Sequence, residues 1–178
     1  FAEMVLMDYM KTVETDTSAR IALLADKLED LFATSHRQNM LSRFEMAAHD
    51  HINNELMSSQ DLCQLYHREL QEMFGNVVRI TDDYHWEWST IPHIYDVPFY
   101  VHSYNFGNLL VLGLYEQYLE EGDSFVLRLK EMLSKGASAS PQVLTQALGV
   151  DITDPIFWQK SLHFIESMVD ELEMLMES

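Results

Sequence analysis

The chain has 178 residues, of which 47% are hydrophobic and 11% aromatic, so it is long and apolar enough to bury a sizeable core. Its 29 acidic residues outnumber 11 lysines and arginines, which gives a formal net charge of −18 at pH 7. A surface this acidic repels phosphate backbones and anionic lipid headgroups, so neither nucleic acid nor a membrane is expected as a partner.

The longest nearly apolar stretch, residues 106–115, is too short to span a bilayer. A single cysteine, Cys63, excludes internal disulfides and suits a reducing compartment, so a cytoplasmic location is expected. The residues around Cys63 follow a helical pattern, which predicts a buried structural thiol. Because the chain begins at Phe1 and not at a methionine, we expect it to be a piece of a longer protein.

All prolines lie in the second half of the chain, so the first half can form nearly continuous helix. Apolar residues at helical spacing predict a first helix over residues 1–14. The polar stretch at residues 15–18 predicts a stop and a restart, with Asp16 or Thr17 as the cap. From Ala19 onward, apolar residues recur every three or four positions, which predicts an amphipathic helix facing a core.

The helix that begins at Ala19 can continue towards Leu56, which is long for one helix of a globular protein. A bend near residues 34–35 or residues 38–39 is therefore predicted.

Ser58 and Asp61 have the spacing of a capping box, in which each side chain accepts a hydrogen bond from the other residue's backbone N–H. They predict the start of a helix that ends at Gly75. Residues 76–97 contain aromatic and β-branched residues but few helix formers, which predicts an ordered loop.

Prolines and glycines mark the predicted helices of the second half. Asp96 is predicted to cap a helix that holds Pro98 in its first turn and runs to about Glu121, with Gly107 and Gly113 allowing close packing. Three further helices are predicted over residues 124–135, 141–148 and 155–176. The last of these is predicted to turn six side chains inward: Phe157, Leu162, Ile165, Met168, Leu172 and Leu175.

Together these elements predict an all-α fold of about six to eight helices, with one ordered loop before the histidines and tyrosines of residues 93–104. The sequence has no internal repeat and no convincing linker. Residues 1–178 are therefore predicted to form a single helical region.

Two common metal signatures are absent from the sequence. It has no His-Glu-x-x-His motif, which marks many zinc peptidases, and no Glu-x-x-His pair, which marks di-iron helical bundles. His49 and His51 are two residues apart and would point to different faces of a helix, so His49-Asp50-His51 is predicted to be solvated surface. No metal ligand is predicted in this chain.

Residues 93–104, which we name the His/Tyr segment, bring two imidazoles and three phenols together: His93, Tyr95, Tyr100, His102 and Tyr104. Such side chains can donate hydrogen bonds to a developing oxyanion and can hold a peptide backbone in place. Tyr100 and Tyr104 are predicted to share a helix face, with His102 near the opposite side. The alternative is an aromatic core helix whose hydroxyl groups bond nearby carbonyls, and the pattern leaves both interpretations open.

Four pieces of the sequence, in the right order, resemble the oligoendopeptidase F family. Residues 91–104 resemble its IPHFY and PFYVYQYA motifs, and residues 37–45 resemble its RQTMFAEFE motif. Residues 133–151 are similar to its C-terminal pattern of small residues, proline and GVD, and residues 169–173 also fit. The resemblance covers nearly all of the chain.

The resemblance implies the helical half of a zincin-like domain in a zinc metalloendopeptidase of the thimet oligopeptidase superfamily. Such enzymes cleave short oligopeptides inside a helix-walled channel. Two histidines of HExxH and a more distant glutamate hold the zinc, and all three are expected upstream of Phe1. Glu3 would follow that glutamate by two helical turns, either supporting the zinc ligands or standing as a surface acid.

This chain would then be the C-terminal part of a peptidase domain, with an oligopeptide substrate and the upstream part of the domain as its partners. By itself it is expected to bind no zinc and to cleave nothing. Carried over residue by residue, the resemblance implies catalytic roles for His93, Tyr95, Tyr100 and His102. It implies substrate binding by His93, Tyr95, Tyr100 and Tyr104.

The family usually has tyrosine at the position of His102, and an imidazole differs from a phenol in reach and in acidity. A second hypothesis is therefore a non-catalytic helical module that binds a peptide or a protein partner through the His/Tyr segment. An intact HExxH motif upstream would favour the enzyme, whereas a broken one would favour the module.

Overall fold

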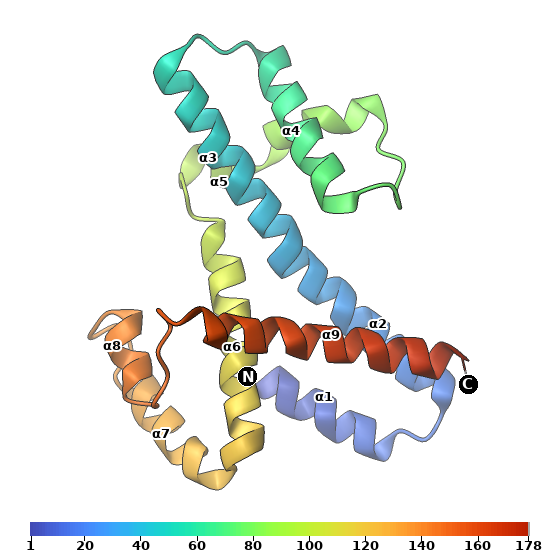
Figure 1. Cartoon of the computed structure of the whole chain (residues 1–178), viewed down its shortest axis with the longest axis vertical. Coiled ribbons are helices and arrows are strands. Elements are labelled where there is room, and N and C mark those ends of the chain that lie inside the picture. Colours follow the sequence, from blue (N-terminus) through green and yellow to red (C-terminus); the bar gives the residue numbers. More distant parts are fainter. Residues whose placement is uncertain (178) are drawn as a thin grey trace. The chain divides into compact units, whose positions relative to one another are not determined.

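The computed structural model describes residues 1–177, and within that range it contains nine α-helices, one π-helical turn, one 3-10 helix and no strand (Figure 1). The predicted all-α fold is therefore confirmed. The short helix α5 (Pro92–Asp96) lies where the sequence predicted a loop, and it brings the number of α-helices above the six to eight expected. No helix in the described range is long and apolar enough to span a membrane.

The chain packs as two compact units. Unit 1 comprises Phe1–Glu29 together with the chain from Asn108 onward, and unit 2 comprises Asp30–Gly107. Each unit has buried apolar side chains of its own, as the next paragraphs describe. The prediction of a single helical region over residues 1–178 stays a prediction.

Unit 1 is built from helices at both ends of the sequence. They are α1 (Ala2–Val13), most of α2 (Thr17–Leu31), most of α6 (His102–Glu121), α7 (Asp123–Ser134), α8 (Pro141–Gln146) and α9 (Pro155–Glu177). A cluster of buried apolar residues joins α6, α7 and the chain around α8: Leu114, Phe125, Leu129, Leu148 and Val150. The helices predicted over residues 1–14, 124–135, 141–148 and 155–176 are thus confirmed, with shifts of one or two residues at their ends.

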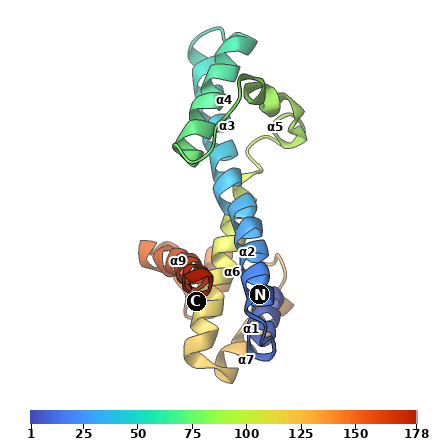
Figure 2. The same cartoon turned by 90° about the vertical axis from the view of Figure 1, so that its right-hand side faces the viewer.

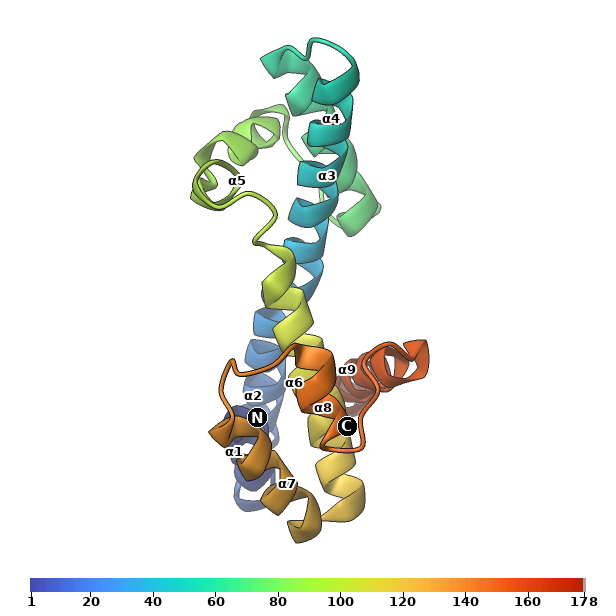
Figure 3. The ribbon, with the colours of Figure 1, turned by 90° about the vertical axis from the view of Figure 1, so that its left-hand side faces the viewer.

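Helix α9 crosses α6 (Figures 1 and 3), and Gly113 of α6 lies close to Phe157 and Ser161 of α9. A Cβ atom added at Gly113 would lie 2.5 Å from the Phe157 ring and 2.8 Å from Ser161 Oγ. The Ser161 hydroxyl donates a hydrogen bond to the Leu109 carbonyl oxygen at 2.8 Å. The predicted close packing is confirmed at Gly113 and is wrong at Gly107, where an added Cβ would meet no atom within 4 Å.

The inward face of α9 differs from the prediction at one position. Leu162 was expected to face inward, but its side chain is exposed, while Ser161 and Phe164 are buried. The buried stripe runs through Ser161, Phe164 and Met168, which are three and four residues apart. Leu162 lies about 100° further around the helix than Ser161, so it points away from this stripe. The other predicted positions, Phe157, Ile165, Met168, Leu172 and Leu175, are buried or half-buried.

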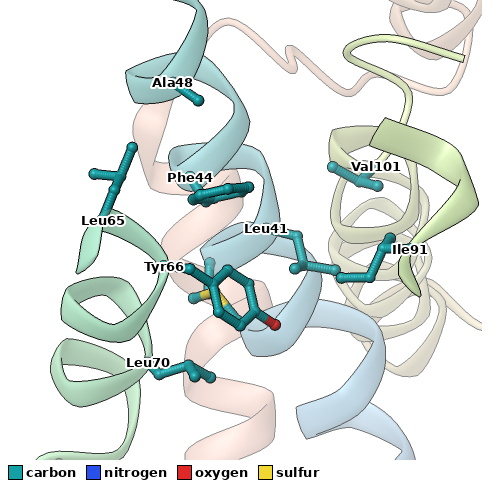
Figure 4. Close-up of a cluster of buried hydrophobic side chains, with 9 residues drawn as sticks. Leu41, Phe44, Ala48, Leu65, Tyr66, Leu70, Ile91 and Val101 are labelled. Atoms are coloured by element: carbon teal, nitrogen blue, oxygen red, sulfur yellow. The ribbon is translucent and has the colours of Figure 1, made fainter. Parts of the chain in front are cut away.

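Unit 2 is a helical hairpin with a folded connection packed against it. It contains the π-helical turn Phe32–Arg37, α3 (Gln38–Asn54), α4 (Ser59–Phe74), the 3-10 helix Asp82–Thr90 and α5. Helices α3 and α4 lie side by side (Figure 2). Side chains of both helices form the core of the unit together with Ile91 and Val101 from the later chain (Figure 4). Those of the two helices are Met40, Leu41, Phe44, Ala48, Leu65, Tyr66 and Leu70.

The long helix predicted from Ala19 changes its geometry without ending. It passes from α2 through the π-helical turn Phe32–Arg37 into α3, so the predicted bend region at residues 34–35 falls within these wider turns. At the start of α2, the Asp16 carboxylate accepts a hydrogen bond from the Ala19 N–H at 3.3 Å, which identifies Asp16 as the cap.

Helix α4 begins as its sequence predicts. The Ser58 N–H donates to the Asp61 carboxylate at 2.8 Å, and the Asp61 N–H donates to Ser58 Oγ at 3.2 Å, so the capping box is confirmed. Cys63 is 1% exposed, and its sulfur accepts a hydrogen bond from the Trp88 indole N–H at 3.4 Å. The prediction of a buried structural thiol is therefore confirmed as well.

Two predictions about residues 76–121 are wrong. The connection expected to be a loop contains the 3-10 helix Asp82–Thr90 and then α5, and Asp96 ends α5 where it was expected to cap a longer helix. Helix α6 begins at His102, so Pro98 lies outside its first turn. The chain cannot be helical at Phe99 because the φ angle there is +61°, in the left-handed region.

Candidate functional site

The His/Tyr segment reverses direction in a tight turn at residues 97–100. The Tyr100 N–H donates to the Val97 carbonyl oxygen at 3.2 Å, which closes the turn. Proline at the second position and a positive φ at the third are the features of a type II turn. The third position of such a turn usually takes glycine, but here it is Phe99, where a left-handed backbone costs about 1–2 kcal/mol.

Three groups contact Phe99 in this conformation. Its N–H donates to Glu45 Oε1 at 2.7 Å, and its carbonyl oxygen accepts a hydrogen bond from His102 Nδ1 at 2.5 Å. Its ring lies against the His49 ring, with centroids 4.7 Å apart. Glu45 is 1% exposed although it carries a carboxyl group, so its contact with the turn comes from inside unit 2.

Three of the predicted site residues lie in contact with one another, one before this turn and two from its end onward. The rings of His93 and Tyr100 stack nearly parallel, with centroids 5.8 Å apart and an interplanar angle of 7°. Tyr104 meets both rings edge-on, at 5.7 Å from His93 and 5.4 Å from Tyr100. A hydrogen bond of 3.1 Å joins the Tyr104 hydroxyl oxygen to His93 Nε2. We name His93, Tyr100 and Tyr104 the imidazole–phenol cluster.

The cluster can offer hydrogen-bond donors to a ligand. Tyr100 is 42% exposed and Tyr104 is 36% exposed, so a ligand can reach part of each residue. When His93 Nε2 carries a proton, it donates to the Tyr104 oxygen, and the Tyr104 hydroxyl proton is then free to point at a ligand. Donation from His93 also polarises that hydroxyl and strengthens it as a donor.

Tyr100 and Tyr104 meet for a reason that differs from the prediction. They were expected to share a face of one helix, but Tyr100 precedes the first residue of α6. Their rings are brought together because the turn at residues 97–100 returns the chain to the start of that helix.

The two remaining predicted residues of the segment have other contacts. The Tyr95 ring lies against Trp88, with centroids 6.4 Å apart, and desolvation by burial raises the pKa of its hydroxyl. His102 is exposed, and the Phe99 carbonyl can only accept, so His102 must carry its proton on Nδ1. A neutral His102 therefore presents Nε2 as an acceptor.

Glu3 belongs to unit 1, in the first turn of α1. Its side chain is 82% exposed and pairs with Lys27 at 3.1 Å. This is the arrangement of a surface acid in the described chain, and a supporting role next to zinc ligands stays a prediction.

The described residues do not form a metal site. Within residues 1–177, no group of three or more histidine, cysteine, aspartate or glutamate side chains could hold a metal ion. His49, Asp50 and His51 are all exposed, as the sequence predicted. The imidazole–phenol cluster, with one imidazole and two phenols, has the character of a hydrogen-bonding site.

Unit 2 also has a hollow of about 500 Å³ between the end of α3 and the start of α4. Its lining is mostly polar and includes His51, Glu55, Asp61 and Arg68. It shares no residue with the His/Tyr segment, so the imidazole–phenol cluster does not line this hollow.

The sequence prediction missed Glu45 and His49, which hold the turn from α3. Two signals could have pointed to them. A glutamate at position 45 lies between the core residues Phe44 and Ala48, where an acid needs a hydrogen-bond partner. Pro98-Phe99 also has the proline of a type II turn without the usual glycine.

Comparison with known proteins extends these observations. Residues 1–164 match the profile of peptidase family M3. The chain is 30% identical over 175 residues to the oligopeptidase PepF of Bacillus subtilis (strain 168), covering 98% of this chain and 26% of that protein. It is 26% identical over 176 residues to an oligoendopeptidase F homolog of Borreliella burgdorferi, covering 98% of this chain and 30% of the relative.

The crystal structure of oligoendopeptidase-F from Enterococcus faecium is similar to this chain with a TM-score of 0.90 and 26% identity, covering 98% of this chain and 34% of that one. This chain therefore spans between a quarter and a third of the length of these relatives. Because the family profile matches most of its length, the chain belongs to peptidase family M3.

Proposed function

We propose that the chain is the C-terminal part of a zinc metalloendopeptidase that hydrolyses peptide bonds of short oligopeptides. In this proposal the imidazole–phenol cluster binds the peptide and stabilises the oxyanion that forms at the scissile carbonyl. The supporting observation is the 3.1 Å contact between His93 Nε2 and the Tyr104 hydroxyl, next to the exposed phenol of Tyr100. Membership of a peptidase family supports a peptide as the ligand of this arrangement.

The two tyrosines and the histidine of the cluster have different roles in this proposal. The two hydroxyl groups donate hydrogen bonds to the peptide carbonyl oxygen and donate more strongly once that oxygen becomes an anion. His93 orients the Tyr104 hydroxyl through their hydrogen bond and packs against Tyr100. For Tyr95 and His102, a direct catalytic role stays a prediction.

The proposal assigns the remaining parts of the enzyme to sequence outside this chain. The described side chains do not form a zinc site, so the metal and its ligands would come from the upstream part of the peptidase domain. This chain alone would then hydrolyse no peptide. A cytoplasmic location also belongs to the proposal and is supported by the lone buried thiol of Cys63.

The test is to replace Tyr100 and Tyr104 by phenylalanine, singly, in the full-length peptidase that carries this chain. Loss of one hydroxyl donor to an oxyanion lowers kcat by about 10²–10³-fold, with little change in the melting temperature because the rings remain. Tyr84→Phe is the matched control, since Tyr84 is an exposed tyrosine of the same unit and lies in the 3-10 helix Asp82–Thr90.

Two results would count against the proposal. Normal kcat with a lower melting temperature in both variants would mean that the tyrosines act only in packing. A wild-type full-length protein that binds oligopeptides but never cleaves them would favour the non-catalytic interaction module.

A further inference from the structure

We propose that Glu45 is a positioning residue of the imidazole–phenol cluster. It holds Phe99 in its left-handed conformation and thereby places Tyr100 against His93. This inference rests on the proposed function only where it concerns catalysis, because the placement of Tyr100 can be measured separately.

The argument begins with the backbone at Phe99. Among residues 1–177, Phe99 is the only residue other than glycine with a positive φ. A bulky side chain disfavours this conformation, so it persists only where surrounding contacts impose it. The turn hydrogen bond between Tyr100 and Val97 forms in several types of turn and does not by itself select a positive φ at Phe99.

Glu45 supplies a contact that does depend on this conformation. In a turn whose ends stay in place, the orientation of the Pro98–Phe99 peptide plane sets both the φ angle of Phe99 and the direction of its N–H. In the conformation with a φ of +61°, that N–H donates to Glu45 Oε1, 2.7 Å away. A flip of this peptide to the conformation with a negative φ at Phe99 would turn the N–H away and leave a buried carboxyl oxygen without this partner. Because Glu45 is only 1% exposed, the loss of this hydrogen bond inside the protein is costly.

The element that carries Glu45 is well fixed. Its neighbours on α3, Phe44 and Ala48, belong to the core of unit 2 (Figure 4). His49 lies one helical turn after Glu45 and places its ring against Phe99. Helix α3 therefore holds both the backbone and the ring of Phe99.

Tyr100 lies between two fixed residues. Phe99 before it is held by α3, and Val101 after it is buried in the core at 1% exposure. The direction in which Tyr100 leaves the backbone is thus set on both sides. Its ring stacks on His93, which lies in α5, before the turn. The hydrogen bond of Glu45 is with the backbone of Phe99, so in this arrangement Glu45 acts on the cluster through Phe99.

The experiment compares two substitutions of Glu45 in the full-length peptidase. Glu45→Gln keeps an oxygen that can accept the Phe99 N–H, whereas Glu45→Met keeps the volume but removes the acceptor. We expect Glu45→Met to abolish the nuclear Overhauser contact between the Tyr100 and His93 rings. We expect it to lower kcat by about 10–100-fold, since misplacement of a positioned group has effects of this size. Glu45→Gln should keep the ring contact and most of the activity.

A rescue variant tests whether Glu45 acts through the backbone of Phe99. Glycine adopts a positive φ without steric cost, so Phe99→Gly in the Glu45→Met background should restore part of the ring contact and of kcat. If Glu45→Met does not fold, the same double variant decides: recovery of folding and of the ring contact supports the inference, and continued failure overturns it.

Two controls separate positioning from stability and from the proposed function. Glu69→Met removes another buried glutamate of unit 2, which pairs with Arg43 at 3.0 Å, and should lower stability without changing the ring contact or kcat. In a Tyr100→Phe background, Glu45→Met should cost less than about 3-fold in kcat, because the hydroxyl that it positions is already gone.

The positioning role of Glu45 and the proposed function of the cluster are contradicted by different results. An unchanged ring contact in Glu45→Met overturns the positioning role, whatever the activity. Loss of the ring contact with unchanged kcat, together with an active Tyr100→Phe variant, overturns the proposed function of the cluster and leaves the positioning role standing.

Discussion

Gly113 shows how a single hydrogen atom in place of a side chain can decide the packing of two helices. An added methyl group at this position would meet the ring of Phe157 and the hydroxyl of Ser161 at less than 3 Å. Gly107, six residues earlier in the same helix α6, has open space around the corresponding position. The two glycines therefore provide a matched pair for substitution.

Gly113→Ala should destabilise unit 1 by about 1–3 kcal/mol, because α9 must move or Phe157 must leave its preferred rotamer. Gly107→Ala should instead stabilise the protein by about 0.5–1 kcal/mol, since alanine restricts the unfolded chain and fits the helix. Denaturant unfolding followed by circular dichroism measures both changes. Equal destabilisation by the two substitutions would show that α6 tolerates no side chain at either glycine and would contradict the packing account.

Helix α4 illustrates how local chemistry fixes the start of an element. Ser58 and Asp61 each accept a hydrogen bond from the other's N–H, and the Ser58 hydroxyl also donates to the Asp61 carboxylate at 2.6 Å. The hydroxyl and then the backbone N–H of Ser58 hold the pKa of Asp61 below its usual value near 3.8. The first turn of α4 is therefore linked to pH through Asp61.

A lowered folded-state pKa means that Asp61 supports the helix above its unfolded-state pKa, and that the support is lost as pH falls through the folded-state value. Amide exchange at Ser58 and in the first turn of α4, corrected for intrinsic rates, should thus show falling protection from about pH 5 to below about pH 3. Asp61→Asn, whose side chain does not titrate, should remove this local pH dependence. Identical pH profiles for the two proteins would mean that the carboxylate contributes nothing to the cap.

The elements differ in how far the sequence could predict them. The ends of α4, α7 and α9 follow from nearby caps, glycines and prolines, and their prediction was correct within about two residues. The start of α6 could not be predicted in this way. It follows a turn in which the Phe99 N–H donates to Glu45, 54 residues away in the sequence, and no local pattern indicates such a contact.

The same distinction holds for the candidate site. Composition and family motifs drew attention to the His/Tyr segment, and three of its five predicted residues lie together: His93, Tyr100 and Tyr104. Their arrangement depends on the turn at Phe99. The Tyr95 ring instead contacts Trp88, and His102 donates a hydrogen bond to the Phe99 carbonyl oxygen. Sequence spacing on an assumed helix could not separate these two groups.

For the whole molecule, the formal charge of −18 at pH 7 is a dominant feature. Arg43 pairs with two acids, Glu69 and Glu72. The hydrogen bond from Arg43 to Glu72 and the charge of Glu69 raise the pKa of the guanidinium. With 29 acids and 11 lysines and arginines in the chain, repulsion among carboxylates opposes compaction.

Salt should therefore stabilise this chain. Raising the sodium chloride concentration from about 0.01 M to about 1 M shortens the screening length from about 30 Å to about 3 Å, which weakens the net repulsion more than the close ion pairs. We expect the melting temperature at pH 7 to rise across this range, as measured by scanning calorimetry. An uncharged solute at matched osmolality is the control, and a fall in melting temperature with salt would show that attractive pairs outweigh the repulsion.

The buried thiol of Cys63 offers a way to measure how often unit 2 opens. Because the sulfur is buried among α4 and Trp88 in unit 2, an alkylating reagent can reach it only when that unit opens. The chain has one cysteine, so each modified molecule gains a single, countable mass increment. The labelling rate under native conditions thus reports the opening of the half that carries the imidazole–phenol cluster, while the other half contributes no signal.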